Sequence, residues 1–266
     1  MNLFSRLKRR ISPEIDQAES HRDTPPSAAF ETLLPKNSEL RHALSEFANY
    51  INGLGGSYHR LDFGSGIVVN GEYDMRKYID NYGIAEDLTG MSVLDIGTSS
   101  GFFALESARR GAEVTAIDIW HPGFYDRMRE ILGLNIRYFQ KSIYDLDDSF
   151  GKFDVVICGS LLLHLRDIFG AIEKIYSVCK KDAIIATTSI ENLPKDDRAL
   201  CEFIGAKTQS SVGEYWVYWY LNAMALERML RAAGFSEAHE VGKFVLTSEP
   251  GKSGFAEPHV VVKATV

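Results

Sequence analysis

The chain has 266 residues, 45% of them hydrophobic and 24% charged, and a formal net charge of −7. These values are typical of a globular protein large enough to bury a core, and the acidic balance argues against a main task of binding a nucleic-acid backbone. Its cysteines, Cys158, Cys179 and Cys201, form no CxxC pair. This argues against a disulfide framework or a metal site and favours a cytoplasmic location. No apolar run reaches the roughly 18 residues that a membrane span needs.

Two segments precede the regular part of the chain. Residues 1–37 are polar and interrupted by prolines, so we expect a flexible arm. Residues 38–90 form a cap segment that begins with an amphipathic helix, with Ser38 as its cap and Gly53 at its end. The remaining pieces of this segment are a strand around 66–69, a turn at Asn70 and Gly71, and a helix from about Glu72.

Strands and helices alternate from residue 91 onward. The expected strands are 92–97, 113–119, 136–142, 153–160, 182–190, 237–248 and 258–266, and the expected helices are 101–111, 122–133, 166–180 and 222–234. Such alternation predicts a parallel sheet with helices on both faces. We therefore expect an α/β, doubly wound, Rossmann-like domain over 91–266, with a seven-stranded, mostly parallel sheet and an antiparallel C-terminal strand.

The stretch VLDIGTSSGFF, residues 93–103, is a strand that runs through a glycine turn into a helix. A dinucleotide fingerprint starting at Gly97 would need glycines at positions 99 and 102, where the chain has Ser99 and Phe102. The second of those glycines lets the backbone approach a pyrophosphate. No Gly-Lys-Ser/Thr follows the turn, so a P-loop is excluded as well.

A different spacing is present around the same turn. Asp95, Gly97 and Gly101 are followed, 21 residues after Gly97, by Asp118 at the end of the second strand. A carboxylate at that place accepts hydrogen bonds from ribose hydroxyls. The alternative is that the acids cap strands and the glycines only turn the chain. The combination of loop and acid resembles the first two motifs of class I S-adenosylmethionine (SAM) dependent methyltransferases.

The resemblance implies a set of cofactor contacts. In that family the loop lies beside the methionine end of SAM and the first acid, here Asp95, helps to hold its amino group. The implied cofactor-binding residues are Asp95, Gly97, Thr98, Ser99, Gly101, Phe102, Asp118, Ile119, Ser142, Ile143, Ser160 and Leu161. One departure is Ser142, which stands where family members often carry an acid beside the adenine.

Residues outside the loop carry a closer resemblance, over roughly residues 50–245. The positions are Tyr58, His59, Asp62, Gly64, Gly66, His164, Trp219 and Asn222. Together they look like the bacterial methyltransferases related to the tRNA wobble-uridine carboxymethyltransferase. The tRNA enzyme has a tyrosine before its histidine that helps to hold the donor's carboxylate, and here Leu163 stands there. This departure implies ordinary SAM and a plain methyl group.

Methyl transfer needs alignment of donor and acceptor and, for some acceptors, removal of a proton. His164 is the first candidate base because it follows the fourth strand and because the ordinary pKa of histidine suits neutral pH. His59 is the second candidate. For each histidine a purely structural role is the alternative. Arg166 and Glu191 also follow strands, where ligands of such sheets bind, although surface pairing is the commoner role of an arginine.

The aromatic run EYWVYWY, residues 214–220, lies in a segment, 207–222, that we expect to cap the acceptor. Alternation places Tyr215, Val217 and Trp219 on one side of an extended chain. Core packing and a homodimer interface are the alternatives for this run. The expected substrate residues are Tyr58, Asp62, Arg166, Glu191, Trp216, Trp219 and Asn222.

Four functions remain open at this point. The first is SAM-dependent methyl transfer to an oxygen or nitrogen of a small molecule such as a sugar, nucleoside or aromatic metabolite. The second is modification of a tRNA base, which the resemblance suggests and the acidic charge of −7 opposes. The third is a non-catalytic SAM-binding or partner-binding protein. A nicotinamide oxidoreductase is disfavoured by the broken fingerprint.

Overall fold

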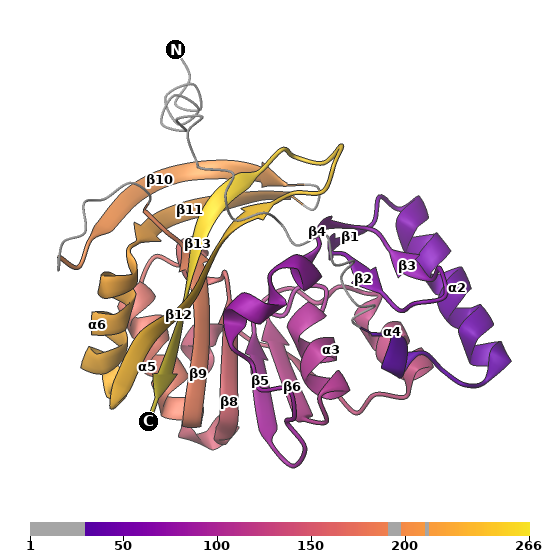
Figure 1. Cartoon of the computed structure of the whole chain (residues 1–266), viewed down its shortest axis with the longest axis horizontal. Coiled ribbons are helices and arrows are strands. Elements are labelled where there is room, and N and C mark those ends of the chain that lie inside the picture. The colour runs from indigo at the N-terminus through magenta and orange to yellow at the C-terminus, as the bar shows by residue number, and fades with distance from the viewer. Residues whose placement is uncertain (1–29, 191–197, 211–212) are drawn as a thin grey trace.

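A sheet of seven strands forms the centre of the protein (Figure 1), whose computed structural model describes residues 30–190, 198–210 and 213–266. The strands are β5 (Ser92–Ile96), β6 (Glu113–Asp118), β7 (Arg137–Gln140), β8 (Phe153–Gly159), β9 (Cys179–Thr188), β12 (Glu237–Thr247) and β13 (Ala256–Thr265). Their spatial order is β12-β13-β9-β8-β5-β6-β7. β13 pairs antiparallel with both its neighbours, and the remaining neighbouring pairs are parallel. The predicted sheet is confirmed.

Helices cover both faces of this sheet. They are α3 (Phe102–Arg109), α4 (Tyr125–Leu132), α5 (Ile168–Val178) and α6 (Ala223–Ala233). Successive side chains of a strand point to opposite faces. In β5, Val93 packs in the core that includes α3 and α4, whereas Leu94 packs in the core that includes α5 and α6. The doubly wound α/β architecture is therefore confirmed.

The N-terminal extension is helical, as expected, and packs on the domain. Helix α2 (Ser38–Gly53) ends at the predicted glycine, but its cap is Asn37, whose Oδ1 accepts a hydrogen bond from Glu39 N at 2.7 Å. Phe30 is fully buried, and its ring lies 5.8 Å from that of Phe63. Residues 30–37 thus belong to the folded body rather than to a flexible arm. The rest of the expected arm, residues 1–29, lies outside the described residues.

Short elements fill the chain between the larger ones. In the cap segment they are β1 (Ser57–His59), β2 (Leu61–Asp62), β3 (Val68–Val69), β4 (Gly71–Tyr73), and the 3-10 helices η2 (Met75–Lys77) and η3 (Ile79–Tyr82). Elsewhere they are the 3-10 helices η1 (Glu31–Leu33), η4 (Ile143–Asp145), η5 (Asp148–Phe150) and η6 (Leu162–His164). β1 pairs in parallel with β4, and β2 pairs antiparallel with β3.

The helix expected from about Glu72 begins later, because Glu72 lies in β4 and the 3-10 helices η2 and η3 follow from Met75. The backbone oxygen of Glu72 accepts a hydrogen bond from Glu249 N at 2.8 Å, and its carboxylate accepts one from Ser253 N at 3.1 Å. Both donors belong to the distant loop between β12 and β13. This tertiary pairing holds the stretch extended, which local sequence cannot reveal.

A long antiparallel hairpin, β10 (Cys201–Ser210) and β11 (Gly213–Leu221), leaves the sheet after β9. It crosses the end of the molecule where the parallel strands finish (Figure 1). In β11, Val217 is buried and Trp219 packs on the core, whereas Tyr215 is 37% exposed and Trp216 is 44% exposed. The hairpin therefore covers the edge of the sheet where α/β proteins bind their ligands.

Candidate active site

A cavity of about 410 Å³ lies at the carboxyl ends of β5, β6 and β8. Small-molecule sites are typically about 300–1,000 Å³ in volume. Its walls come from three strand ends, the cap segment and the hairpin. The lining residues are Tyr58, His59, Tyr73, Met75, Tyr82, Gly97, Ser99, Phe103, Asp118, Ile119, Trp120, Gly159, Ser160, Leu161, His164, Gly213, Glu214, Tyr215 and Leu246.

The loop between β5 and α3 is held by its own polar residues. Gly97 has a φ of 74°, and a Cβ there would lie 3.2 Å from the side chain of Leu161. Thr98 Oγ1 donates to Asp95 Oδ2 at 2.7 Å. Ser99 has a φ of 48°, in the left-handed region, and its N–H donates to an oxygen of Asp118 at 2.9 Å. The loop backbone is thus fixed to the ends of β5 and β6.

Ser100 ties this loop to the cap segment. Its Oγ accepts hydrogen bonds from Tyr58 N at 3.1 Å and from His59 N at 3.0 Å. These bonds join positions about forty residues apart in sequence. Of the two serines between the glycines, Ser99 thus acts through its backbone N–H and Ser100 through its side chain, which a glycine could not replace.

Asp95, Thr98 and Phe102 are almost completely buried and do not line the cavity. Burial, together with the nearby Asp118 carboxylate, raises the pKa of Asp95 to about 7. Its carboxylate accepts the Thr98 hydroxyl, and a contact of Asp95 with the cofactor stays a prediction. Gly101 also lies outside the lining, and a Cβ there would meet the Tyr125 ring at 2.4 Å.

Asp118 lines the cavity at the end of β6, where its carboxylate accepts Ser99 N at 2.9 Å and Trp120 N at 3.1 Å. Burial raises its pKa. The next two side chains, Ile119 and Trp120, are 72% and 53% exposed and line the same cavity. A carboxylate beside an exposed apolar surface suits a ligand that joins hydroxyl groups to a flat ring. Sequence reasoning named Ile119 but missed Trp120.

Ser142 and Ile143, expected beside the adenine, do not line the cavity. The hydroxyl of Ser142 caps η4 by accepting Tyr144 N at 3.3 Å. Ile143 is 4% exposed and packs in the core. Their local roles are therefore those of a helix cap and a core residue.

Ser160 and Leu161, which follow β8, both line the cavity as expected. Ser160 has a φ of 53°. Its Oγ is buried and, within the described part of the chain, has no hydrogen-bond partner. A buried hydroxyl without a partner is costly, so a ligand group that pairs with it would gain binding energy.

His164 lies in η6 beneath the hairpin, and its Nδ1 is 2.7 Å from the backbone oxygen of Trp216. A carbonyl oxygen can only accept, so Nδ1 carries the proton and the neutral ring keeps a lone pair at Nε2. Burial lowers the pKa of His164, so the ring is neutral at pH 7. Both the geometry and the protonation state are those of a proton acceptor at the cavity wall.

His59 is the weaker candidate for a base. It is 6% exposed and packs among Tyr58, Phe102 and Phe103, with ring centroids 4.9, 6.0 and 6.4 Å away. Burial lowers its pKa to about 3. An imidazole with so low a pKa holds a proton poorly, although the ring does line the cavity.

Three residues expected to bind substrate make structural contacts within the protein. Asp62 forms an ion pair with Arg76, with Oδ2 and Nη1 2.7 Å apart. Asn222 caps α6 by accepting Ala225 N at 2.9 Å. Trp219 Nε1 donates to the backbone oxygen of Arg166 at 3.2 Å. None of these side chains lines the cavity.

The remaining substrate candidates divide between the cavity and the surface. Tyr58 lines the cavity, as expected. Arg166 lies outside it and donates to the hydroxyl of Tyr218 at 3.1 Å. The Trp216 ring stacks on Tyr218 on the outer face of the hairpin, with centroids 5.7 Å apart. Glu191 lies outside the described residues.

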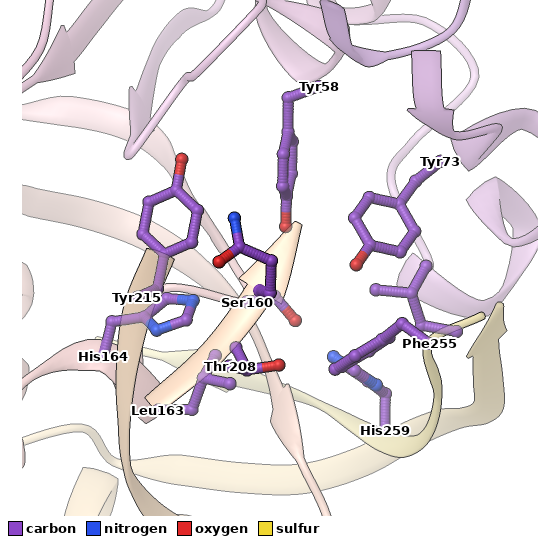
Figure 2. Close-up of a pocket in the computed structure, with 11 residues that line it drawn as sticks. Tyr58, Tyr73, Ser160, Leu163, His164, Thr208, Tyr215, Phe255 and His259 are labelled. Atoms are coloured by element: carbon purple, nitrogen blue, oxygen red, sulfur yellow. The ribbon is translucent and has the colours of Figure 1, made fainter. Parts of the chain in front are cut away.

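Sequence reasoning missed Tyr73, Tyr215 and His259. Tyr73 and Tyr215 line the cavity, and His259 lines a small recess next to it, shown in Figure 2. Tyr215 belongs to the aromatic run that was expected to cap the acceptor, but Trp216 and Trp219 were chosen from that run. His259 lies in a strand of ordinary core composition, where no local signal distinguishes it.

The described ranges 30–190, 198–210 and 213–266 contain neither a metal-binding cluster nor a membrane-spanning helix. No group of three or more His, Cys, Asp or Glu side chains there is arranged to hold a metal ion. No helix in the same ranges is both long and apolar enough to cross a membrane.

Comparison with known proteins finds similarity to methyltransferases. Residues 93–183 match the family model described as a methyltransferase domain. The ubiquinone biosynthesis O-methyltransferase of Azotobacter vinelandii is 32% identical over 123 residues, which cover 45% of this chain and 52% of that protein. Its counterpart in Rickettsia prowazekii is 28% identical over 146 residues, 54% of each chain. The chain thus spans about half the length of the curated relatives that it matches.

Solved structures support the same fold. The N-terminal domain of EvdMO1, solved with SAH bound, aligns with a TM-score of 0.58 at 17% identity and covers 83% of this chain and 96% of that one. At this identity the likeness concerns the fold. Residues 93–183 thus match the methyltransferase-domain model, within a chain whose seven-stranded sheet has the fold of the EvdMO1 N-terminal domain.

Proposed function

We propose that the protein transfers the methyl group of SAM to an oxygen or nitrogen atom of a small molecule. The observation that carries the proposal is the position of Asp118, which lines a cavity of about 410 Å³ at the end of β6, beside the β5–α3 loop. The family match over residues 93–183 supports the same reading. The relatives' names point to oxygen as the methylated atom.

The cavity residues fit SAM. When bound, SAM supplies a methyl group already activated by its sulfonium charge. Asp118 would accept the ribose hydroxyls, and Ile119 and Trp120 would provide an apolar surface for the adenine. Gly97 leaves the loop backbone accessible at the cavity wall.

His164 would accept the proton of the acceptor at Nε2. Its Nδ1 is fixed by the Trp216 oxygen, so the ring is already oriented before the acceptor arrives. The cap segment 38–90 and the hairpin segment 207–222 would enclose the acceptor, because Tyr58 and Tyr215 line the cavity from these two sides. The third function, SAM binding without catalysis, would give the oriented His164 no role as a base.

A small acceptor is favoured over tRNA. The named relatives are enzymes of ubiquinone biosynthesis, and neither lysine nor arginine is among the described residues that line the cavity. The finer likeness to relatives of the tRNA wobble-uridine carboxymethyltransferase stays a proposal. Its main departure, Leu163, is 4% exposed and apolar, which supports ordinary SAM as the donor.

The test is methyl transfer from radiolabelled SAM. The purified protein is incubated with a low-molecular-weight metabolite extract or with bulk tRNA, and label is counted in each after separation. Label in small molecules that requires the protein is the expected result. Label confined to tRNA would favour the second function, and no transfer to either would contradict the proposal.

A further inference from the structure

A small recess of about 30 Å³ lies beside the main cavity (Figure 2). Tyr58, Tyr73, Ser160, His164, Tyr215 and Leu246 line both spaces, so the two adjoin. The recess adds residues from the hairpin and from the C-terminal pair of strands, including Thr208 and His259. A cavity needs about 10–15 Å³ to hold one water molecule, so the recess has room for a small polar substituent and not for a ring.

Two imidazoles face this recess. In Figure 2, His164 and His259 lie on opposite sides of Ser160. His259 is 2% exposed, its Nδ1 is 3.0 Å from the backbone oxygen of Glu257, and its ring stacks on Phe244 at 5.2 Å. As in His164, the carbonyl fixes the proton at Nδ1 and leaves a lone pair at Nε2. Burial lowers the pKa of His259 to about 4, so the ring is neutral at pH 7.

The recess contains a further polar atom without a partner. Ser160 Oγ is buried and makes no hydrogen bond with any residue that the structure describes. An apolar substituent in this space would leave that hydroxyl unsatisfied, at a cost. A hydroxyl group can donate one hydrogen bond and accept others, so it can satisfy both an imidazole lone pair and the serine.

The charge of the lining argues against an anionic acceptor. Asp118 and Glu214 are the charged residues among the described lining of the cavity and the recess, and both are acidic. The nearby cation Arg166 is directed to Tyr218 instead. A carboxylate or phosphate on the acceptor would therefore be desolvated without a counter-charge.

We propose that the recess binds an uncharged hydroxyl group of the acceptor, and that His259 determines this choice by accepting a hydrogen bond from it at Nε2. The inference rests on the proposed methyl transfer and narrows its substrate class to neutral, hydroxyl-bearing small molecules. His164 remains the base, and His259 is a specificity-determining residue.

The first test separates acceptors by charge. A metabolite extract is divided by ion exchange at pH 7 into anionic, neutral and cationic pools, and each pool is incubated with the protein and radiolabelled SAM. The expected result is label in products of the neutral pool. Label mainly in products of the anionic or cationic pool would overturn this inference while leaving methyl transfer standing. No label in any pool would overturn the proposed function and this inference with it.

The second test uses variants of the recess with dilutions of the neutral pool as acceptor. His259→Phe keeps the stacked ring but removes both nitrogens, and His259→Gln places a side-chain acceptor near the former Nε2. We expect His259→Phe to raise the half-saturating amount of the pool by on the order of tenfold. His259→Gln should raise this amount by less, because its side chain can still accept the hydrogen bond. The half-saturating SAM concentration should be unchanged in both.

A structural role for His259 predicts a different pattern, in which both variants change the half-saturating amounts of SAM and acceptor together. That pattern would overturn the inference, as would an unchanged response to the acceptor in His259→Phe.

Ser160→Gly provides an independent variant, because glycine accepts the φ of 53° while removing the hydroxyl. It should weaken acceptor use in the same direction as His259→Phe, and no effect would contradict the assigned role of the recess. The matched control is His239→Gln on the exposed face of β12.

Discussion

The surroundings of His164 fix both the orientation and the protonation state of its ring. Its Nδ1 bond to the Trp216 oxygen, at 2.7 Å, sets both the orientation of the ring and the position of its proton. Burial lowers its pKa, which keeps the ring neutral and able to accept a proton at Nε2. His59 lines the same cavity but is packed among aromatic rings, and its pKa of about 3 makes it the poorer base.

We expect His164→Gln to lower turnover by about 10²- to 10⁴-fold, the usual contribution of a positioned base. The affinity for S-adenosylhomocysteine should stay within about threefold of the wild type, because no bond of the β5–α3 loop involves His164. Steady-state kinetics and calorimetry measure the two quantities, and His239→Gln provides the exposed control. Undiminished turnover in His164→Gln would remove His164 as the base.

Residues that act through a sequence pattern could be predicted, and residues that act through tertiary placement could not. Asp118 follows from the spacing of strand, loop and acid. Asp62 and Asn222 were read as substrate residues, yet one pairs with Arg76 and the other caps α6. His259 reaches the recess only because β13 returns antiparallel beside β9, which no local pattern reveals.

Among the elements, the loop between β5 and α3 connects the cofactor site to the cap segment. Ser99 binds Asp118 through its backbone N–H, whereas Ser100 uses its side chain to accept two N–H groups of β1. Position 99 therefore tolerates a glycine and position 100 does not.

Ser100→Ala should lower the free energy of unfolding by about 1–3 kcal/mol, since it leaves the N–H groups of Tyr58 and His59 without their partner. Ser99→Gly should change it by less than about 0.5–1 kcal/mol, because relief of the left-handed φ offsets the added freedom of the unfolded chain. Urea unfolding compares the two variants. Equal effects at both positions would contradict the distinction.

The regular elements follow from periodicity, since strands and helices each bury one repeating set of side chains. The short elements of the cap segment do not, because the stretch around Glu72 is held by bonds to the loop between β12 and β13. The hairpin was predictable only in part. Alternation grouped the side chains of β11 into two sides without showing which side faces the body, and the pairing with β10 depends on a chain reversal that composition did not show.

At the scale of the whole molecule, three buried titratable groups link stability to pH. The pKa of His59 is lowered to about 3 and that of His259 to about 4. Below pH 6.5 these two histidines therefore bind protons in the unfolded chain but not in the folded chain. The contribution of these histidines to the free energy of unfolding is complete above pH 6.5 and is lost as the pH falls toward 4. Asp95, with its pKa raised to about 7, has the opposite effect: it stabilises the fold increasingly as the pH falls toward 3.8.

Each such group changes the free energy of unfolding by up to about 1.4 kcal/mol per pH unit. Between pH 6.5 and pH 4, His259→Phe should therefore show a shallower loss of stability than the wild type, and Asp95→Asn a steeper one. Urea unfolding at a series of pH values gives both slopes. Slopes that match the wild type in both variants would mean that these groups titrate as they do in the unfolded chain.

The central claim is that the cavity around Asp118 binds SAM, and binding to the folded state is the most direct test of it. S-adenosylhomocysteine at about 100 times its dissociation constant should add roughly 2.7 kcal/mol to the free energy of unfolding. Asp118→Ala also loses the bonds to Ser99 and Trp120, so each protein is compared with and without ligand. We predict a clear thermal shift for the wild type, little shift for Asp118→Ala at the same concentration, and none with NADH. A shift with NADH but not with S-adenosylhomocysteine, or an undiminished shift in Asp118→Ala, would contradict the account.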